Sequence, residues 1–501
     1  MDIKSTDLVS LFEKALHGEI DTTLQETGIV VQVGDASCRI HGLDRALYGE
    51  LLEFEGGNKG IVLNLEEDHV LAFLIYTHIP VNELERVKRT NTVFTIPVGN
   101  TLLGRVVDPR GNPIDGLGPI QSTEMRPIET AIPGISQRSP VNESLETGIL
   151  AIDALVPIGR GQRELIIGNR STGKTSLALD TILHQKGKNI ICIYVSIGQR
   201  EANVAKMVRT LAEHGSLEYT IIVSATASDS SLENYLAPYV GCTMGEFFRD
   251  QQRDVLIIYD DLSNHAIAYR EMSLLMRRAP GREAYPGDIF YLHARLLERA
   301  GKLLSGGSLT ALPMVETQSD DITAYIPTNL ISITDGQVFL DSTLFRKGVR
   351  PAVNVELSIS RVGGAAQTKA MKRVTRSLRL ELAQYHELLG FAQFGTELDP
   401  ISQQRLARGA IVVELLKQPQ FVTYSFVDQV IMLLLLQAKV LDTIDLKQVL
   451  DFARQFVSYV QSVYPELYSE IAETKELRAG VETKLLDIAK EFTKISGITT
   501  P

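Results

Sequence analysis

The spacing of apolar residues changes along the chain, and each change predicts a different kind of domain. Residues 24–94 contain short β-rich runs separated by Gly, Asp and Asn turn signals, which predicts a small closed β-barrel. In residues 95–367 apolar runs alternate with helical segments, which predicts a mostly parallel α/β sheet covered on both faces. Residues 368–501 keep i, i+3, i+4, i+7 spacing, which predicts an α-helical bundle. The predicted fold class is therefore multidomain, with these three parts in that order.

Residues 1–23 precede the predicted barrel and form a separate segment. Their apolar positions follow helical spacing, so we expect one short amphipathic helix. A single helix has little core of its own, and two uses remain open: docking on a partner or folding back on this chain. The segment lacks a basic start followed by an apolar core, so we do not expect a secretory signal.

Composition and charge exclude several classes of protein. Lys and Arg number 50 and Asp and Glu 61, so the net charge is −11, which argues against a general nucleic-acid binder. The most apolar run, Gln429–Ala438, is half the length of a membrane span. Cys38, Cys192 and Cys242 lie far apart without metal-ligand spacing, so we expect buried, reduced thiols.

A glycine-rich motif lies between a predicted strand and a predicted helix. Its residues are Gly168, Asn169, Arg170, Ser171, Thr172, Gly173, Lys174 and Thr175, which match GxxxxGK[ST]. Glycines let the backbone wrap a phosphate, and the helix start supplies free N–H groups. Lys174 would neutralise the β- and γ-phosphates, and the Thr175 hydroxyl would bind Mg²⁺. The alternative is an ordinary strand-to-helix turn, which the strand, helix and spacing together disfavour.

Two further residues extend this predicted Mg-ATP site. Asp260 stands at the end of the apolar strand VLIIYDD, where nucleotide-binding folds of this kind carry the carboxylate that lies beside Mg²⁺. We expect the next residue, Asp261, to be a structural carboxylate of the turn. The strand IICIYVSIG runs into Gln199, where a hydrolytic site would need a carboxylate to accept a proton from water. Helix geometry would point Glu201 elsewhere. The site is therefore expected to bind Mg-ATP without turning it over; alternatively, Gln199 is a polar helix cap and another carboxylate is the base.

Long stretches of this sequence resemble the alpha subunit of F-type ATP synthases. They are GNRSTGKTSLALDTI, LIIYDDLSNHAIAYREMSLLMRRAPGREAYPGDIFYLHARLLERA, GSLTALPMVETQSDDITAYIPTNLISITDGQ, SISRVGGAAQTKAMK and LELAQYHELLGFAQFG. The resemblance covers essentially the whole chain and the same domain order, with a central RecA-like P-loop domain. The beta subunit is less similar, because it has a GGAGVGKT-like loop and a catalytic Glu where Gln199 stands, and it lacks SRVGxAAQ.

The resemblance implies a role in a rotary ATP synthase. Three alpha-like and three beta-like chains would alternate in a ring around the gamma subunit of the central stalk. The beta-like chains would make ATP, driven by proton or sodium flow through a membrane rotor sector. The N-terminal helix would dock the delta subunit of the peripheral stalk. The protein would be a peripheral membrane protein on the cytoplasmic face of the bacterial inner membrane, or alternatively on the stromal face of the thylakoid.

The resemblance also assigns roles to individual residues. The alpha-like chain would hold a slowly exchanging Mg-ATP, with Gln199 and Asp260 near Mg²⁺ and the γ-phosphate. Arg361 would reach into the neighbouring catalytic site as an arginine finger, and Ser358 would support that segment. By itself, a lone Arg before a Gly turn is more typical of a surface or structural residue. Residues Arg170 to Ser176 would surround the phosphates. The adenine would be surrounded by Arg350, Pro351, Gln418 and Gln420.

This chain departs from the family pattern around its own nucleotide. The family loop usually reads GDRQTGKT, whereas here Asn169 replaces Asp and Ser171 replaces Gln. The family reads GQKRSTVAQ where this chain reads GQREANVAK, so Arg200 stands at the Lys position. We expect a divergent member of the family with altered nucleotide affinity.

Two other functions compete with this interpretation. A self-sufficient hexameric ATPase, such as a Rho-type RNA translocase, shares a small barrel followed by a RecA-like core. Its barrel should carry exposed aromatic and basic residues for RNA. Here residues 24–94 contain Phe54, Phe73, Tyr48 and Tyr76 but are rich in Glu and Asp. A structural ring spacer with a decayed pocket is the second alternative, and the intact Lys174, Thr175 and Asp260 argue against it.

Overall fold

A computed structural model describes residues 26–34, 36–76, 79–122, 124–393 and 399–495. The predicted helix at residues 1–23 lies outside the described residues. The chain divides into two compact units. The first unit holds the residues up to Thr95 together with Met272–Arg278, and the second holds the rest.

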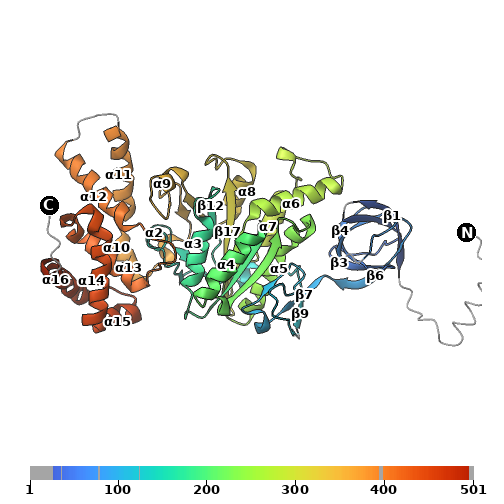
Figure 1. Cartoon of the computed structure of the whole chain (residues 1–501), viewed down its shortest axis with the longest axis horizontal. Coiled ribbons are helices and arrows are strands. Elements are labelled where there is room, and N and C mark those ends of the chain that lie inside the picture. Colours follow the sequence, from blue (N-terminus) through green and yellow to red (C-terminus); the bar gives the residue numbers. More distant parts are fainter. Residues whose placement is uncertain (1–25, 35, 77–78, 123, 394–398, 496–501) are drawn as a thin grey trace, which may run out of the picture. The chain divides into compact units, whose positions relative to one another are not determined.

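The first unit contains the predicted β-barrel (Figure 1). Its strands close in the order β1-β2-β5-β4-β3-β6, and every pairing is antiparallel. Apolar side chains at alternate positions, including Val30, Ile40 and Leu52, fill the interior. The strands are β1 (Thr27–Gly34), β2 (Ser37–His41), β3 (Glu50–Phe54), β4 (Lys59–Leu65), β5 (Val70–Tyr76) and β6 (Arg86–Val93).

The second unit is built on a mostly parallel sheet. Its strand order is β19-β18-β12-β17-β15-β13-β14-β8, and β16 pairs with β17. The predicted strands IICIYVSIG and VLIIYDD form as β13 and β15, and β8, β18 and β19 extend the sheet at its two edges. These strands are β8 (Val106–Val107), β12 (Leu165–Asn169), β13 (Ile190–Gln199), β14 (Thr220–Thr226), β15 (Asp254–Asp260), β16 (Gly301–Lys302), β17 (Ser308–Thr317), β18 (Gly336–Leu340) and β19 (Ile359–Ser360).

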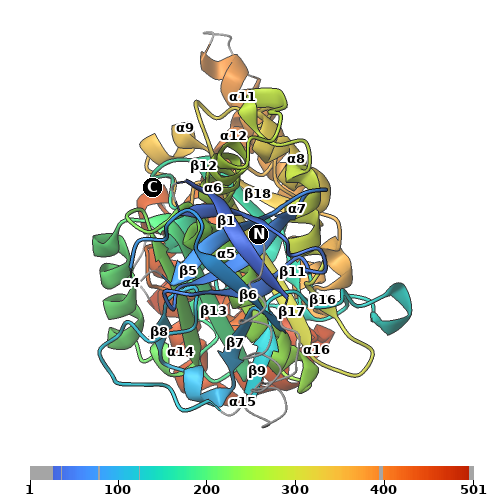
Figure 2. The ribbon, with the colours of Figure 1, turned by 90° about the vertical axis from the view of Figure 1, so that its right-hand side faces the viewer.

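Helices cover both faces of this sheet. On β13, Cys192 and Tyr194 belong to the same buried cluster as Met207 of α4. The alternating residues Ile193 and Val195 face α5, where a Cβ on Gly241 would lie 2.4 Å from Val195 Cγ2. Because side chains alternate between the faces of a strand, α4 and α5 lie on opposite sides, and α4 is seen on the outer flank of the strands in Figure 2.

The helices that flank this sheet and two small pairs of strands complete this part of the chain. The helices are α2 (Leu150–Leu155), α3 (Lys174–Leu183), α4 (Glu201–Glu213), α5 (Ser231–Asp250), α6 (Leu262–Leu275), α7 (Ile289–Leu297), α8 (Tyr325–Ile333) and α9 (Ser342–Arg346). Two short pairs form outside the main sheet, β7 (Thr95–Val98) with β9 (Glu124–Pro127) and β10 (Ser144–Leu145) with β11 (Ile158–Gly159).

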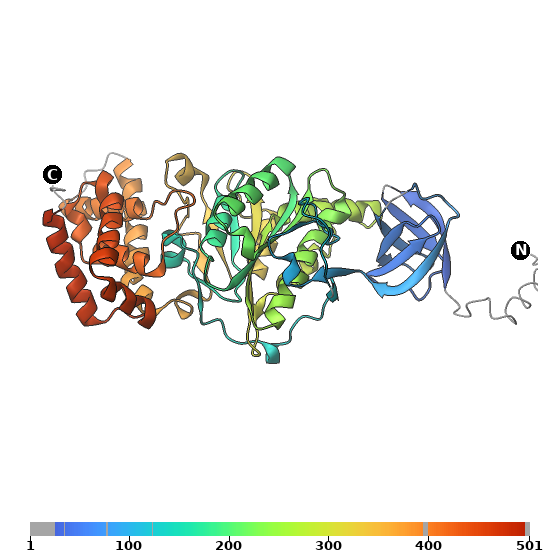
Figure 3. The same ribbon diagram turned by 60° about the horizontal axis from the view of Figure 1, so that its bottom comes forward.

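The C-terminal helices form the predicted bundle, drawn in orange and red in Figure 3. The apolar run at Gln429–Ala438 lies mainly in α13, whose residues Val430–Leu436 are buried in the core. Among the described residues, none of the helices combines the length and the apolar character that a membrane crossing requires. The helices are α10 (Lys369–Thr375), α11 (Leu378–Gln393), α12 (Pro400–Leu415), α13 (Phe426–Gln437), α14 (Val449–Val463), α15 (Pro465–Thr474) and α16 (Ala479–Ile495).

All three cysteines are buried and free, as expected. Burial raises the pKa of Cys38 to about 12 and that of Cys242 to about 11, and it also raises the pKa of Cys192. The thiolate is the reactive form of cysteine, so these side chains are unreactive apolar packing groups in the folded chain.

The packing of α13 makes a testable prediction about stability. Leu433 is 0% exposed, so Leu433→Ala should lower the free energy of unfolding of the second unit by about 2–5 kcal/mol, because it leaves a cavity. Leu380 is 63% exposed on α11, and Leu380→Ala should change it by less than about 0.5 kcal/mol. Denaturant unfolding of both variants checks this, and equal losses would contradict the packing described here.

Candidate nucleotide-binding site

The loop between β12 and α3 has the geometry of a phosphate cradle. Gly173 stands at φ +103°, in the left-handed region, and immediately precedes the first residue of α3. The unpaired N–H groups of the first helical turn therefore face the loop. Lys174 is 7% exposed, and its Nζ donates to the carbonyl oxygens of Gly168 at 2.8 Å and Asn169 at 2.7 Å. Burial lowers the pKa of Lys174, and the nearby carboxylates oppose that shift.

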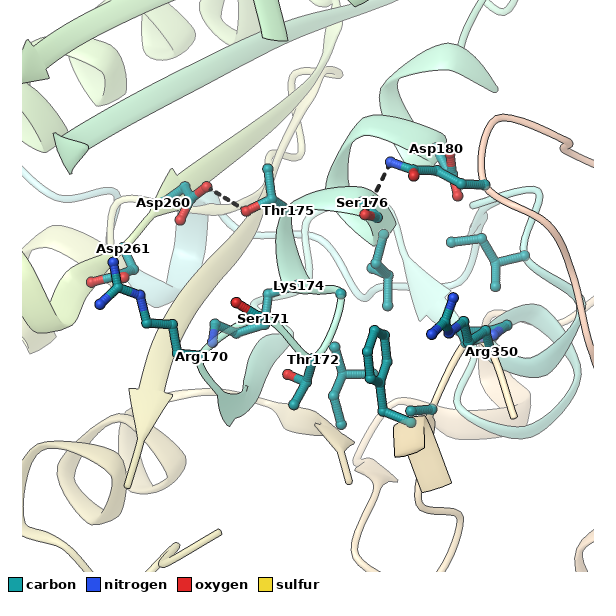
Figure 4. Close-up of a pocket in the computed structure, with 18 of the residues that line it drawn as sticks. Arg170, Ser171, Thr172, Lys174, Thr175, Ser176, Asp180, Asp260, Asp261 and Arg350 are labelled. Atoms are coloured by element: carbon teal, nitrogen blue, oxygen red, sulfur yellow. Dashed lines mark hydrogen bonds between the residues drawn. The ribbon is translucent and has the colours of Figure 1, made fainter. Parts of the chain in front are cut away.

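The sheet order brings Asp260 to this loop. β12 and β15 both flank β17, so the carboxyl ends of these parallel strands meet at one edge. Thr175 Oγ1 donates to Asp260 Oδ2 at 3.0 Å (Figure 4). The buried Tyr194 hydroxyl on β13 donates to the same oxygen. The predicted pair of Mg²⁺ ligands, Thr175 and Asp260, therefore lies within hydrogen-bonding distance.

Gln199 and Glu201 lie differently with respect to Asp260. Gln199 ends β13, and its Nε2 donates to Asp260 Oδ1 at 3.2 Å. Glu201 is an exposed residue at the start of α4 and does not line the cavity around the loop. The position next to the phosphate loop on this strand therefore carries an amide, which cannot accept a proton at neutral pH.

The residues expected around the adenine come from the second half of the chain. The Arg350 guanidinium lies 4.4 Å from the centre of the Phe345 ring, and Figure 4 shows Arg350 well apart from Asp260. Gln418 Nε2 donates to the Gly148 carbonyl oxygen at 2.8 Å, and Gln418 N–H donates to the Arg350 carbonyl oxygen at 2.8 Å. Gln420 Nε2 donates to Ser176 Oγ at 3.0 Å, which joins this segment to α3.

These groups line one cavity of ≈ 600 Å³, a volume suited to a nucleotide. Gly168 and Asn169 do not line it, but their carbonyl oxygens accept hydrogen bonds from Lys174. The predicted residues that line it are Arg170, Ser171, Thr172, Gly173, Lys174, Thr175, Ser176, Gln199, Asp260, Arg350, Pro351, Gln418 and Gln420.

The cavity also contains residues that the sequence analysis missed. One of them is Glu316, the next-to-last residue of β17. Asn203 of α4 also lines the cavity, but it belongs to the stretch GQREANVAK, in which a departure from the family pattern was already noted. Asp180, one turn after Ser176 on α3, also lines the cavity and accepts a hydrogen bond from the Phe421 N–H at 2.9 Å. Burial raises the pKa of Asp180 to about 6. Glu316 could have been found from its place at the end of an apolar strand, as Asp260 was.

The donor set fits a magnesium ion that a phosphate completes. Within the described residues there is no group of three or more His, Cys, Asp or Glu side chains arranged to hold a metal. Mg²⁺ usually keeps several waters and binds one or two carboxylates together with substrate phosphates. Burial raises the pKa of Asp260, and burial with the neighbouring Asp260 charge raises that of Asp261 to about 7. A cation in the cavity would favour the ionised carboxylates.

Asp261 stabilises a turn and also lines the cavity. Its Oδ1 accepts the Asn264 N–H at 2.9 Å at the start of α6, which is the turn role expected from the sequence. It also lines the cavity, which was not expected.

Arg361 and Ser358 lie outside this cavity. Ser358 is 0% exposed, and its Oγ accepts the Phe339 N–H at 2.9 Å, so it ties the segment before β19 to β18. Arg361 directly follows β19 and is exposed. Its N–H donates to the Asp335 carbonyl oxygen at 2.8 Å, which fixes the backbone but leaves the side chain at the surface.

The departures at positions 169 and 171 have different surroundings. Asn169 Oδ1 accepts hydrogen bonds from Thr317 Oγ1 and the Asp320 N–H, each at 2.8 Å. A carboxylate oxygen could accept the same two bonds, so Asn169 leaves these loop contacts intact. Ser171 is exposed at φ +63° and lines the cavity with a short hydroxymethyl group.

Three regions of the chain match family descriptions in the same order as its domains. Residues 23–90 match "ATP synthase alpha/beta family, beta-barrel domain". Residues 148–360 match the nucleotide-binding domain of that family, and residues 367–492 match "ATP synthase alpha/beta chain, C terminal domain". The barrel, α/β and helical regions predicted from the sequence are thereby confirmed as the fold of this family.

Curated relatives match over almost the full length of the chain. It is 54% identical to ATP synthase subunit alpha of Caldanaerobacter subterraneus subsp. tengcongensis, covering 98% of both chains. It is 52% identical to ATP synthase subunit alpha of Acetivibrio thermocellus, again covering 98% of both. Identity to ATP synthase subunit alpha of Clostridium botulinum strain Eklund 17B is 53%, covering 99% of both. The chain belongs to the ATP synthase alpha subunits.

Proposed function

We propose that this chain is the regulatory, largely non-catalytic ATP-binding alpha subunit of a rotary F-type ATP synthase. Three copies alternate in a ring with three beta-type catalytic chains around a gamma subunit. The beta-type chains make ATP from ADP and phosphate with a transmembrane proton or sodium gradient. Family membership and the intact phosphate loop support this proposal.

The observation that carries the non-catalytic assignment is the amide at Gln199. Its Nε2 lies 3.2 Å from Asp260 Oδ1, and Gln199 ends the strand where a hydrolytic site would need a carboxylate. An amide can hold a water or a phosphate oxygen but provides no base. Lys174, Thr175 and Asp260 retain the groups needed to hold Mg-ATP, so binding without turnover is the function that this cavity supports best.

Arg361 acts, in this proposal, on the neighbouring beta-type site. Its side chain is exposed and lies outside the chain's own cavity, which is the arrangement an arginine supplied in trans requires. Ser358 holds the preceding segment against β18 through the Phe339 N–H. In the same proposal, residues 1–23, which lie outside the described residues, bind the delta subunit of the peripheral stalk. The complex sits on the cytoplasmic face of a bacterial inner membrane through its rotor sector.

The barrel interior disfavours an RNA translocase. Phe54 and Phe73 are each 1% exposed, so their rings cannot stack on bases without unfolding the barrel. Tyr48 is 41% exposed, and the side chain of Tyr76 lies outside the described residues.

The first prediction concerns the isolated chain. It should bind Mg-ATP and hydrolyse almost none, and Lys174→Ala should weaken binding about 10-fold or more, because a charged hydrogen-bond donor to phosphate is lost. Lys186→Ala is the matched control, since Lys186 donates to the His214 carbonyl oxygen and does not line the cavity. Calorimetry and phosphate release measure both. Steady turnover that Lys174→Ala abolishes would overturn the non-catalytic assignment.

The second prediction concerns the departure at position 171. Ser171→Gln should tighten ATP binding about 2- to 10-fold, because the longer amide side chain can add one neutral hydrogen bond over the phosphates. Ser305→Gln, at an exposed position remote from the cavity, should leave the affinity unchanged. Unchanged or weaker binding by Ser171→Gln in calorimetry would contradict this explanation of the departure.

The third prediction concerns the ring assembled with beta-type chains. Arg361→Ala should lower steady-state ATP hydrolysis about 10³- to 10⁵-fold, the usual contribution of an arginine finger. Arg361→Lys should be nearly as damaging, because an ammonium lacks the planar two-pronged geometry.

The control for the Arg361 variants is the nucleotide bound to this chain's own cavity, which should not change. If Arg361→Ala retains more than about a tenth of the activity, the finger assignment is wrong. If the variant instead loses its own nucleotide, Arg361 belongs to the local cavity.

A further inference from the structure

Glu164 is a buried carboxyl group that the nucleotide cavity does not use. It is 0% exposed and immediately precedes β12, at the opposite end of that strand from the phosphate loop. Its Oε2 accepts a hydrogen bond from Gln162 Nε2 at 2.7 Å. Its Oε1 has no hydrogen-bond partner among the described residues. A buried polar atom left unpaired costs free energy, so this oxygen needs an explanation.

The carboxyl group of Glu164 reaches across β18 toward the segment that carries Arg361. Gly336 pairs with Ser360 in the β18–β19 register. A Cβ on Gly336 would lie 2.5 Å from Glu164 Oε2 and 2.2 Å from the Ile359 carbonyl oxygen. The absence of a side chain at position 336 is therefore what lets the carboxyl group approach β19, because any larger residue would fill that space.

One glutamine joins Glu164 to the residue before Arg361. Gln162 Nε2 lies 2.7 Å from Glu164 Oε2 and 3.1 Å from Ser360 Oγ. Ser360 Oγ also donates to the Pro157 carbonyl oxygen at 2.8 Å and accepts the Gly363 N–H at 3.1 Å. The backbone on both sides of Arg361 is thus held to the same buried group of side chains.

The charge of Arg361 acts on Glu164. Burial raises the pKa of Glu164 well above its ordinary value, and the nearby Asp335 charge raises it further. The Gln162 hydrogen bond and the positive charge of Arg361 lower it. The Arg361 guanidinium makes no hydrogen bond or ion pair within the part of the chain that is described. An unpaired acceptor and an unpaired cation therefore lie near each other.

We propose that Glu164 is a positioning residue for Arg361, with its free Oε1 accepting a hydrogen bond from one edge of the guanidinium. The opposite edge of the guanidinium then faces the neighbouring catalytic site. A guanidinium has five donors in a fixed planar fork, so a carboxylate on one edge sets the direction of the other. Groups that orient a reacting side chain in this way are commonly worth about 10- to 100-fold. The inference rests on the proposed function of Arg361.

The test uses the ring reconstituted with beta-type chains. Glu164→Gln keeps the volume and replaces the carboxyl group by an amide, and it should lower kcat about 10-fold or more with KM and this chain's bound nucleotide unchanged. Glu298→Gln is the matched control. It neutralises a half-exposed carboxylate of the same region, which pairs with Arg163, and should stay within about 2-fold of the parent.

A double-mutant cycle separates positioning from a general structural role. In the Arg361→Ala background, Glu164→Gln should cause no further loss, because the group it orients is absent. A further loss of the same size as in the parent ring would overturn the proposal, as would a kcat within about 2-fold of the parent for Glu164→Gln alone. If Arg361→Ala itself retains activity, the proposed finger fails, and the contact is judged by the next measurement.

The second measurement needs only the isolated chain. Infrared titration of the carboxyl band, with Glu164→Gln identifying the signal of Glu164, follows its protonation. The groups that face this carboxyl are Gln162, Asp335 and Arg361. Because Arg361 lowers the pKa of Glu164, Arg361→Ala should move the titration to higher pH. An unchanged titration would overturn the proposed contact, whatever the ring assays show.

Discussion

The nucleotide cavity depends on the way Lys174 is held at the start of α3. Its ammonium lies between the Gly168 and Asn169 carbonyl oxygens at 2.8 and 2.7 Å, and almost none of it is exposed. A buried cation is tolerated only where such acceptors or counter-charges satisfy it. Gly173 turns the chain so that the ammonium and the free N–H groups of the helix face the same space. That space would therefore attract a polyphosphate in preference to a neutral ligand.

The sheet around β12 links this cavity to the segment that carries Arg361. Asn169 ends β12 at the phosphate loop, and Glu164 immediately precedes its first residue. At about 3.3 Å per residue, the strand separates the two ends by roughly 17 Å. β18 pairs with β12, and β19 pairs with the other edge of β18 and leads directly into Arg361. A nucleotide bound at one end and an arginine presented at the other are thus both supported by one buried strand.

Much of the fold and of the site could be predicted because local patterns and spatial neighbours coincide. The phosphate loop is continuous in sequence, and Asp260 ends a strand two places from β12, so a strand-end rule was sufficient. The strand β6 could not be predicted from apolar spacing, because its sequence RVKRTNTV is mostly polar and its side chains are mostly exposed. β8 and β19 are two residues long, too short for any periodicity to show. Glu164 could not be predicted, since its significance lies in contacts with Gly336 and Gln162 that only tertiary pairing creates.

The most direct measurement follows the nucleotide held by this chain while the assembled ring works. The isolated chain is first loaded with Mg-ATP that is labelled on the γ-phosphate, and it is then assembled with beta-type chains. The assembled ring is given excess unlabelled ATP for many turnovers. The ring is then freed of unbound nucleotide and the retained label analysed. If Gln199 leaves the cavity without a base, the retained label remains ATP while phosphate accumulates from the beta-type sites. Loss of the retained label from ATP as labelled phosphate, at the rate of steady-state turnover, would contradict binding without turnover.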